Sequence, residues 1–393
     1  MRLLGVSLSL LALGTLAQSE AEENLVSRGF DLFYNLEYDQ AQALFQQASA
    51  QDPNSPDMHN HVAETILFRE MLRDGALESE LVSGDNSFLR RAKLNPARET
   101  QREFLNEISA AISLASRRVE KNPNDTAALY ALGIAYGLRA NYNWLVNKSW
   151  RESLSDATAA RRPHNRITEL EPANVDATLV QGLHDYVVGS LPLVWRMIGF
   201  LGGIRGDKEK GIQTVENVAR RGDRNRVDAQ ILLCALYRRE NQPMRAVPLV
   251  EDLMRRYPRN YLLPLELSQM YSMAGDGQKA LAAVEGLARA KTAHMPGLDR
   301  VSWEKIYFQE GTIQFWYRDL DHSLANLQKV TAAAENLDLN TGAFAYLRMG
   351  QIYDMTRRRD EAIFAYKKCI AFAPEADAAR ESRRYLVSPY RRL

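Results

Sequence analysis

The stretch VDAQILLCALYRRENQPMRAVPLVEDLMRRYP, residues 227–258, carries the spacing that decides the fold. Counted from its first residue, apolar and small side chains recur at positions 7, 8 and 11, which share one face of a helix. They recur at positions 20, 24 and 27, which share one face of a second helix. A proline at position 32 ends that helix because its ring nitrogen cannot donate a hydrogen bond. The residues at these positions are Leu233, Cys234, Tyr237, Ala246, Val250, Leu253 and Pro258.

The same pattern starts again 34 residues later, at Tyr261, and its small residues explain how the helices pack. Ser268 stands at position 8 and Ala280 at position 20, where small side chains let two helix axes approach closely. The spacing resembles the 34-residue pattern of the tetratricopeptide repeat family, and this resemblance covers nearly the whole chain after residue 17. A single helix pair cannot bury its apolar stripes, so neighbouring pairs must stack. The expected fold is all-α, a right-handed superhelix (α-solenoid) of irregular helix pairs with an inserted apolar helical segment.

The repeat pattern divides the chain into units of unequal regularity within a single repeat domain over residues 18–393. A turn-rich insert over residues 78–95 interrupts the second unit and is expected to form a long loop. We expect units near residues 22–55, 56–123, 126–172, 175–222, 227–260, 261–292, 304–338 and 343–376, followed by a capping helix and tail over 376–393.

Composition excludes one broad class of function. The 393 residues include 50 basic and 49 acidic side chains, a formal net charge of +1, which removes the field that a general nucleic-acid binder uses. The two cysteines, Cys234 and Cys369, stand at packing positions of separate units, so we expect buried thiols rather than a disulfide. No cofactor is expected.

The N-terminus has the three regions of a secretory signal peptide. Arg2 supplies a positive charge, residues 3–13 form an apolar run, and small residues stand at Thr15 and Ala17. We expect cleavage before Gln18 and export of the chain, so that the protein is periplasmic or secreted. An uncleaved anchor and an apolar first helix are the alternatives.

Residues 187–204 are apolar and form the inserted segment of the expected fold. Pro192 and Arg196 interrupt the run, and an arginine at the centre of a membrane span costs about 2.5 kcal/mol or more. We expect this segment to pack on the repeats. Contact with a membrane interface is the alternative, which would make the protein a peripheral membrane or lipid-binding protein.

A narrower resemblance starts at Ser190-Leu191-Pro192, continues through Ile198-Gly199-Phe200 and ends at Gly206-Asp207-Lys208-Glu209-Lys210-Gly211. This stretch is similar to the segment that marks the fungal inclusion body clearance proteins and their animal tetratricopeptide relatives. The resemblance implies association with membranes and lipid handling rather than catalysis, and it favours a non-enzymatic scaffold.

Two groups of residues suggest chemistry, and neither meets the requirements of a site. On a helix, His59 and His61 would point about 200° apart, so only His61 and Glu64 could approach one ion. A metal-dependent hydrolase would need a further ligand from elsewhere in the chain. The glycines of residues 199–208 lack the Lys-Ser/Thr ending of a phosphate loop, because Asp207 follows Gly206. We therefore expect no metal, no nucleotide and no catalytic residue.

The remaining functional signal is a set of aromatic residues on the first helices of the units. Positions 2, 5, 9, 12 and 13 of those helices face the inner surface of a repeat superhelix. Aromatic side chains there would bind an extended protein or peptide partner, because they bury a large area at low cost in entropy. The alternative is that some of them pack against the inserted segment. The candidate partner-binding residues are Phe30, Phe33, Tyr34, Tyr130, Tyr186, Phe308, Phe315 and Trp316.

Overall fold

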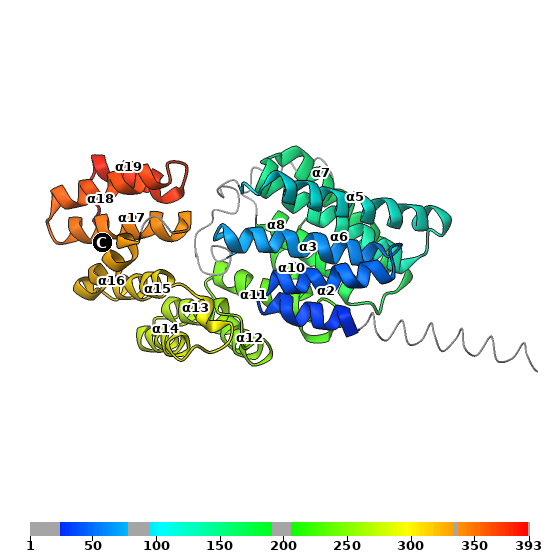
Figure 1. Cartoon of the computed structure of the whole chain (residues 1–393), viewed down its shortest axis with the longest axis horizontal. Helices are drawn as coiled ribbons and strands as arrows, with labels where there is room; N and C mark the ends of the chain where they lie inside the picture. Colours follow the sequence, from blue (N-terminus) through cyan, green and yellow to red (C-terminus); the bar gives the residue numbers. More distant parts are fainter. Residues whose placement is uncertain (1–23, 78–93, 191–205, 334–336, 392–393) are drawn as a thin grey trace, which may run out of the picture. The chain divides into compact units, whose positions relative to one another are not determined.

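A computed structural model describes residues 24–77, 94–190, 206–333 and 337–391 (Figure 1). Within these ranges all regular structure is helical, and consecutive helices pack as pairs, which confirms the all-α repeat fold expected from the spacing. The expected signal peptide, most of the 78–95 insert and residues 191–204 of the apolar segment lie outside the described residues.

The chain divides into two compact units, and each is described by itself. Unit 1 holds the described residues of Met1–Arg69 and Asn95–Val180. Within it α6 packs against both α5 and α7, and a small apolar cluster of Leu25, Ala48 and Met58 joins its first three helices. Its elements are a helix over 24–34, α2 (Tyr38–Gln51), most of α3 (Pro56–Arg73), α5 (Arg98–Lys121), α6 (Thr126–Tyr142), η2 (Asn143–Asn147), α7 (Trp150–Leu170) and η3 (Asp176–Thr178).

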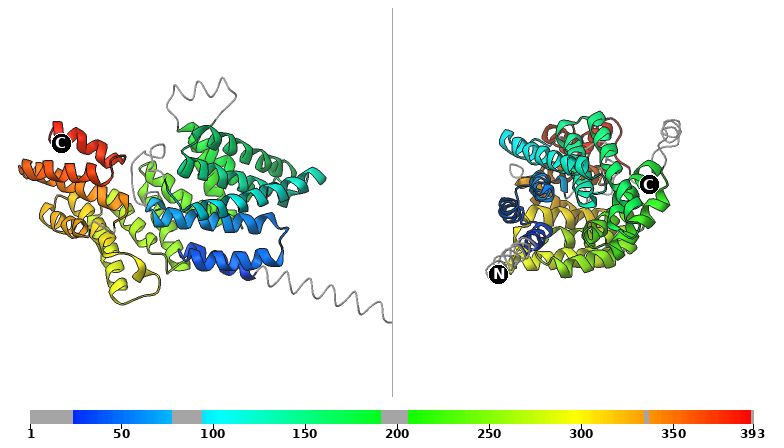
Figure 2. Two further views of the ribbon diagram at one scale, coloured as in Figure 1. Left: turned by 45° about the horizontal axis from the view of Figure 1, so that its top comes forward. Right: turned by 90° about the vertical axis from the view of Figure 1, so that its right-hand side faces the viewer.

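Unit 2 holds the described residues of Glu70–Leu94 and Gln181–Leu393. From α10 to α19 each helix packs against the next, a succession that runs from green to red in the left view of Figure 2. Its elements are most of α8 (Leu179–Gly189), α10 (Lys208–Arg221), α11 (Arg226–Arg239), α12 (Pro243–Arg256), α13 (Leu262–Met273), α14 (Gly277–Thr292), η4 (Leu298–Arg300), α15 (Trp303–Trp316), α16 (Leu320–Ala332), α17 (Leu339–Met355), α18 (Arg359–Phe372) and α19 (Asp377–Val387). Whether the two units act as the single repeat domain expected from the sequence stays a prediction.

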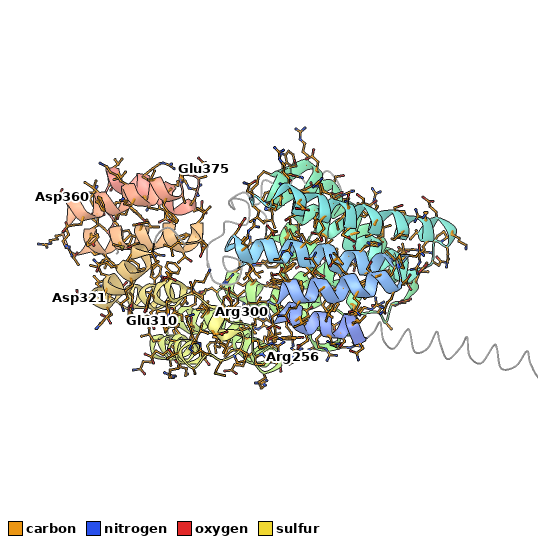
Figure 3. The ribbon with its side chains drawn as sticks, viewed as in Figure 1. Arg256, Arg300, Glu310, Asp321, Asp360 and Glu375 are labelled. Atoms are coloured by element: carbon orange, nitrogen blue, oxygen red, sulfur yellow. The ribbon has the colours of Figure 1, made fainter. Side chains whose placement is uncertain are left out.

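The small positions of the repeat lie where helices approach most closely. Ala246 and Ala280, both at position 20, are fully buried. In the last pair a Cβ atom added to Gly350 would lie 2.4 Å from the ring of Tyr366, so only glycine fits at that point of α17. Of the charged side chains labelled in Figure 3, Arg300, Asp321, Asp360 and Glu375 are exposed, whereas Arg256 and Glu310 are partly buried.

One turn geometry recurs between the two helices of five described pairs. Each first helix ends with a residue at positive φ, the following N–H donates to a carbonyl five residues back, and the turn residue donates to a carbonyl three residues back. This is the Schellman arrangement, which satisfies carbonyls left open at a helix end. The residues at positive φ are Leu36, Asn241, Gly275, Arg318 and Arg357, and each stands at position 15 of its unit.

Candidate partner-binding surface

Four of the eight candidate aromatic residues are buried, three are partly buried and one is exposed. Phe33, Tyr34, Tyr186 and Phe315 are buried, so their rings have almost no area to offer a partner. Phe30, Tyr130 and Phe308 are partly buried, and Trp316 is exposed. Binding of a partner by this set stays a prediction, and only these last four residues retain surface for it.

Tyr186 shows why an aromatic residue at an inner position can be structural. Its side chain is 1% exposed, and its hydroxyl donates a 3.0 Å hydrogen bond to Glu240, whose other carboxylate oxygen lies 2.6 Å from the ammonium of Lys208. Burial raises the pKa of Tyr186 to about 12. Tyr186 is therefore enclosed by its neighbours rather than open on an inner surface, and its contacts join α8, α10 and α11 of unit 2.

In unit 1 the accessible aromatic residues are also engaged with neighbours. The ring of Phe30 stacks on Tyr34 and meets the edge of His61, with centroids 6.0 Å and 4.8 Å away. The ring of Tyr130 meets the edge of His164 at 5.3 Å. His164 is completely buried, neither of its ring nitrogens has a hydrogen-bond partner among the described residues, and burial lowers its pKa to about 4. These contacts fit a structural role in unit 1.

The most accessible aromatic of the set is Trp316, which lies at the end of α15 with 42% of its surface exposed. The guanidinium carbon of Arg348 lies 4.8 Å from the centre of its ring and 4.9 Å from that of Phe315. Arg348 belongs to α17, which packs against α15, and its guanidinium donates a 2.7 Å hydrogen bond to Gln351. We call Phe315, Trp316, Arg348, Gln351 and Asp354 the Trp316 surface; Trp316 and Arg348 are its accessible members, and the side chains of Phe315, Gln351 and Asp354 are buried.

Asp354 brings a carboxylate to this surface from the last turn of α17. Both of its oxygens accept hydrogen bonds from the Arg359 guanidinium, at 2.9 Å and 3.1 Å, and one accepts a 2.8 Å bond from the hydroxyl of Tyr366. The same oxygen accepts a 2.8 Å bond from the backbone N–H of Tyr390. Arg359 also donates to the carbonyls of Tyr385 and Leu386, so it fastens the end of α19 to α17.

The sequence analysis missed Arg348, Asp354 and Tyr390. Arg348 carries no signal because a lone arginine on a helix is usually solvated. Asp354 stands at position 12 of the last unit, which is an inner position. It was missed because only aromatic residues at the inner positions were candidates. Tyr390 follows the capping helix, and no local pattern relates it to Phe315, whose ring centre lies 6.3 Å from its own.

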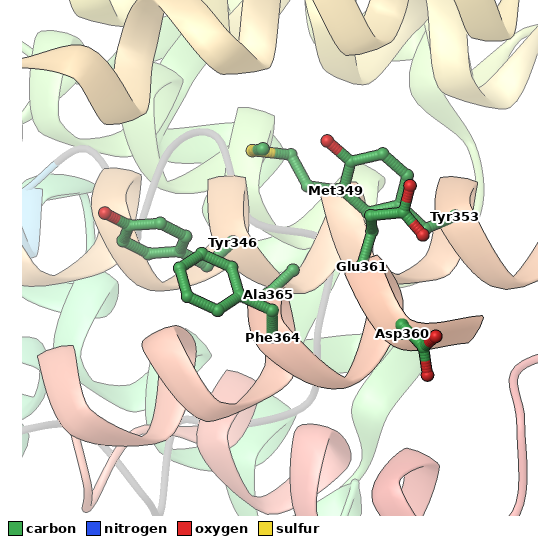
Figure 4. Close-up of a pocket in the computed structure, with 7 residues that line it drawn as sticks. All are labelled: Tyr346, Met349, Tyr353, Asp360, Glu361, Phe364 and Ala365. Atoms are coloured by element: carbon green, nitrogen blue, oxygen red, sulfur yellow. The ribbon is translucent and has the colours of Figure 1, made fainter. Parts of the chain in front are cut away.

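A cavity of about 340 Å³ lies on another part of the α17–α18 pair (Figure 4). Tyr346, Met349, Tyr353 and Phe364 form its apolar wall, and Asp360 and Glu361 stand at its edge. Glu361 pairs with Arg358 at 3.0 Å, and Arg358 in turn covers the ring of Tyr353. One of the two carboxylates at this cavity is thus paired within the chain.

The candidate metal-binding residues do not form a group. Among the described residues no three His, Cys, Asp or Glu side chains could hold an ion together. His59 pairs with Glu107 at 2.6 Å, a hydrogen bond that raises the pKa of the histidine against the effect of burial. The ring of His61 instead contacts those of Phe30 and Phe45. Cys234 and Cys369 are free and buried, as expected from their packing positions, and burial raises the pKa of Cys369 to about 11.

Of the apolar segment 187–204, the structure describes only residues 187–190. Val187 is partly exposed at the end of α8, and residues 191–204 lie outside the described ranges. In the part of the chain that the structure describes, no helix has the length and apolar character needed to cross a membrane.

Comparison with known proteins relates the chain to helical repeat structures and to no sequence family. No family model and no curated protein matches the sequence. Yeast Tom70 matches over 94% of this chain and 96% of its own, with 11% identity and a TM-score of 0.40. The human IFIT1 dimer with m7Gppp-AAAA matches over 93% and 84%, with 13% identity and a TM-score of 0.46. A tetratricopeptide repeat protein from Parabacteroides merdae matches over 80% and 93%, with 12% identity and a TM-score of 0.32. Likeness at this level says nothing about what the chain binds.

Proposed function

We propose that the chain is an exported, non-catalytic repeat scaffold that binds a protein or peptide partner through the Trp316 surface of unit 2. The observation that carries the proposal is the arrangement of Trp316, which is 42% exposed with Arg348 stacked on its ring. Buried Phe315 packs edge to face against this ring, with the ring centres 5.3 Å apart.

Tryptophan and arginine are the residues that most often dominate binding energy at protein interfaces. A large ring held by its neighbours loses little entropy when a partner covers it, because few of its rotamers are available beforehand. Here the ring is held by a cation from the next first helix, so α15 and α17 present one joint surface. This arrangement supports recognition of a segment that runs across both helices.

The test compares Trp316 with a second exposed tryptophan that lies in the other unit and also has an arginine over its ring. Trp150 on α7 of unit 1 is 58% exposed and also has an arginine, Arg151, over its ring at 5.3 Å. Residues 18–393 serve as bait in an extract of the native host, and the captured partner is then purified and titrated against each variant. We expect Trp316→Ala to weaken binding by about 2 kcal/mol or more, roughly thirtyfold. Trp150→Ala should bind as the wild type does.

Melting curves separate a loss of binding from a loss of folding. Both tryptophans are exposed, so both variants should melt near the wild-type temperature. The proposal fails if Trp316→Ala and Trp150→Ala bind the partner equally, or if the loss at Trp316 is matched by unfolding of unit 2.

A further inference from the structure

The last described residues of the chain lie on the Trp316 surface. Helix α19 ends at Val387, and the segment 388–391 follows it. Within this segment only Tyr390 is partly buried; Ser388, Pro389 and Arg391 are exposed. The segment therefore contacts the rest of unit 2 mainly through one residue.

Tyr390 makes the contacts that a bound peptide would make at this place. Its backbone N–H donates to Asp354 at 2.8 Å, and its ring lies 6.3 Å from that of Phe315 and 5.2 Å from that of Tyr385. A backbone donor to a carboxylate fixes the position of an extended chain without depending on its side chains, whereas an aromatic contact selects the residue. The surface thus takes an aromatic residue on an extended segment.

We infer that segment 388–391 is an internal ligand that occupies the Trp316 surface and must leave before a partner segment carrying an aromatic residue can bind there. The inference rests on the proposed function, and it adds the regulation of that site. Tyr390 covers Phe315 and uses an oxygen of Asp354, so the tail and a partner compete for the same ring and the same acceptor.

The strength of the contact suits a displaceable ligand. A short tether keeps the tail at an effective concentration in the millimolar range, so a weak site is mostly occupied by it. Arg359 holds the end of α19 through the carbonyls of Tyr385 and Leu386, so the helix stays in place when the residues after it move away. Displacement then removes the Tyr390 ring from Phe315 and one of the three donors from that oxygen of Asp354, while the bonds from Tyr366 and Arg359 remain.

The experiment uses a chain that ends at Val387 and a labelled peptide of residues 387–393, VSPYRRL. We expect the peptide to bind the shortened chain, with fluorescence anisotropy saturating below about 1 mM, and to bind the complete chain at least tenfold more weakly because the tethered tail competes. A peptide with Tyr390→Ala should bind the shortened chain at least tenfold more weakly than the parent peptide. Circular dichroism shows whether the shortened chain keeps its fold.

Point variants in the complete chain test the inference even if the shortened chain folds poorly. Tyr390→Ala should open the surface and raise the affinity for both the peptide and the partner, whereas Ser388→Ala, an exposed position, should change neither. Failure of the peptide to bind the folded shortened chain, or equal binding to the complete and shortened chains, overturns the inference. If Trp316→Ala weakens partner binding but Tyr390→Ala leaves it unchanged, the proposed function is supported and the inference about the tail is wrong.

Discussion

Arg238 and Glu266 form an ion pair inside unit 2, between α11 and α13. Their side chains are almost completely buried, and one guanidinium nitrogen lies 3.0 Å and 3.3 Å from the two carboxylate oxygens. Burial raises the pKa of Glu266 to about 7, although the charge of Arg238 opposes this change. Attraction to the arginine therefore does not fully offset the cost of removing the carboxylate from water.

This pair predicts a stability that depends on pH. The pKa of Glu266 in the folded protein lies above its ordinary value of 4.5, so the native state binds more protons than the unfolded state between pH 4.5 and 7. The contribution of Glu266 is thus fully present below pH 4.5 and is lost as pH rises through 7, a change of at most about 3 kcal/mol. Urea denaturation of the wild type and of Glu266→Gln across this range measures it.

The difference in unfolding free energy between wild type and Glu266→Gln isolates this residue from other titrating groups. It should fall from pH 4.5 to 7 and then stay level. Glu285→Gln, at an exposed position on α14, serves as the control and should show no such slope. A flat difference for Glu266 as well would mean that the carboxylate is ionised in the fold throughout.

At the scale of the helix pair, the same turn recurs at position 15 of five described units. Leu36, Arg318 and Arg357 adopt positive φ there, a conformation that costs a residue with a Cβ about 1 to 2 kcal/mol. Only one of the five turns has glycine. Paired carbonyls and the packing of the two helices hold the other four, so tertiary contacts outweigh the local preference of the residue.

The close approach of helices predicts which small residues tolerate no enlargement. Ala280 on α14 is fully buried at position 20, so Ala280→Leu should overpack the α13–α14 pair and destabilise the protein by about 1 to 3 kcal/mol. Ala246→Leu on α12 should behave alike. Ala282 lies on the exposed face of α14, and Ala282→Leu should be nearly neutral. Equal melting temperatures for Ala280→Leu and Ala282→Leu would show that the helix faces are misplaced.

For the whole molecule, export makes a prediction that is independent of the fold. Residues 1–17 have the form of a cleavable signal peptide, so chain recovered from the native host should begin at Gln18 or within a few residues of it. Mass spectrometry of the purified protein identifies its N-terminal residue. Ala17→Phe places a large residue before the expected cut and should leave uncleaved chain, and an intact Met1 on the wild-type protein would contradict the proposed export.

The sequence by itself determined the helix pairs and their buried faces, because helical periodicity is local. A residue seven or eight places into a unit lies on a fixed side of its helix whatever follows in the chain. Cys234, Ser268, Ala246 and Ala280 are buried as their positions require. The boundary at Pro258 is equally local, and α12 ends two residues before it, at Arg256.

Only the tertiary structure decided which inner aromatic residues are exposed. Phe315 and Trp316 are neighbours at positions 12 and 13, yet one is buried and the other exposed. Arg348 on the next first helix lies over both rings, whereas Phe315 also belongs to the apolar core of the last helix pairs and contacts Tyr390 beyond the capping helix. Burial depends on which residues distant in sequence come to lie against a ring, and repeat spacing places a side chain on a face without saying what covers that face.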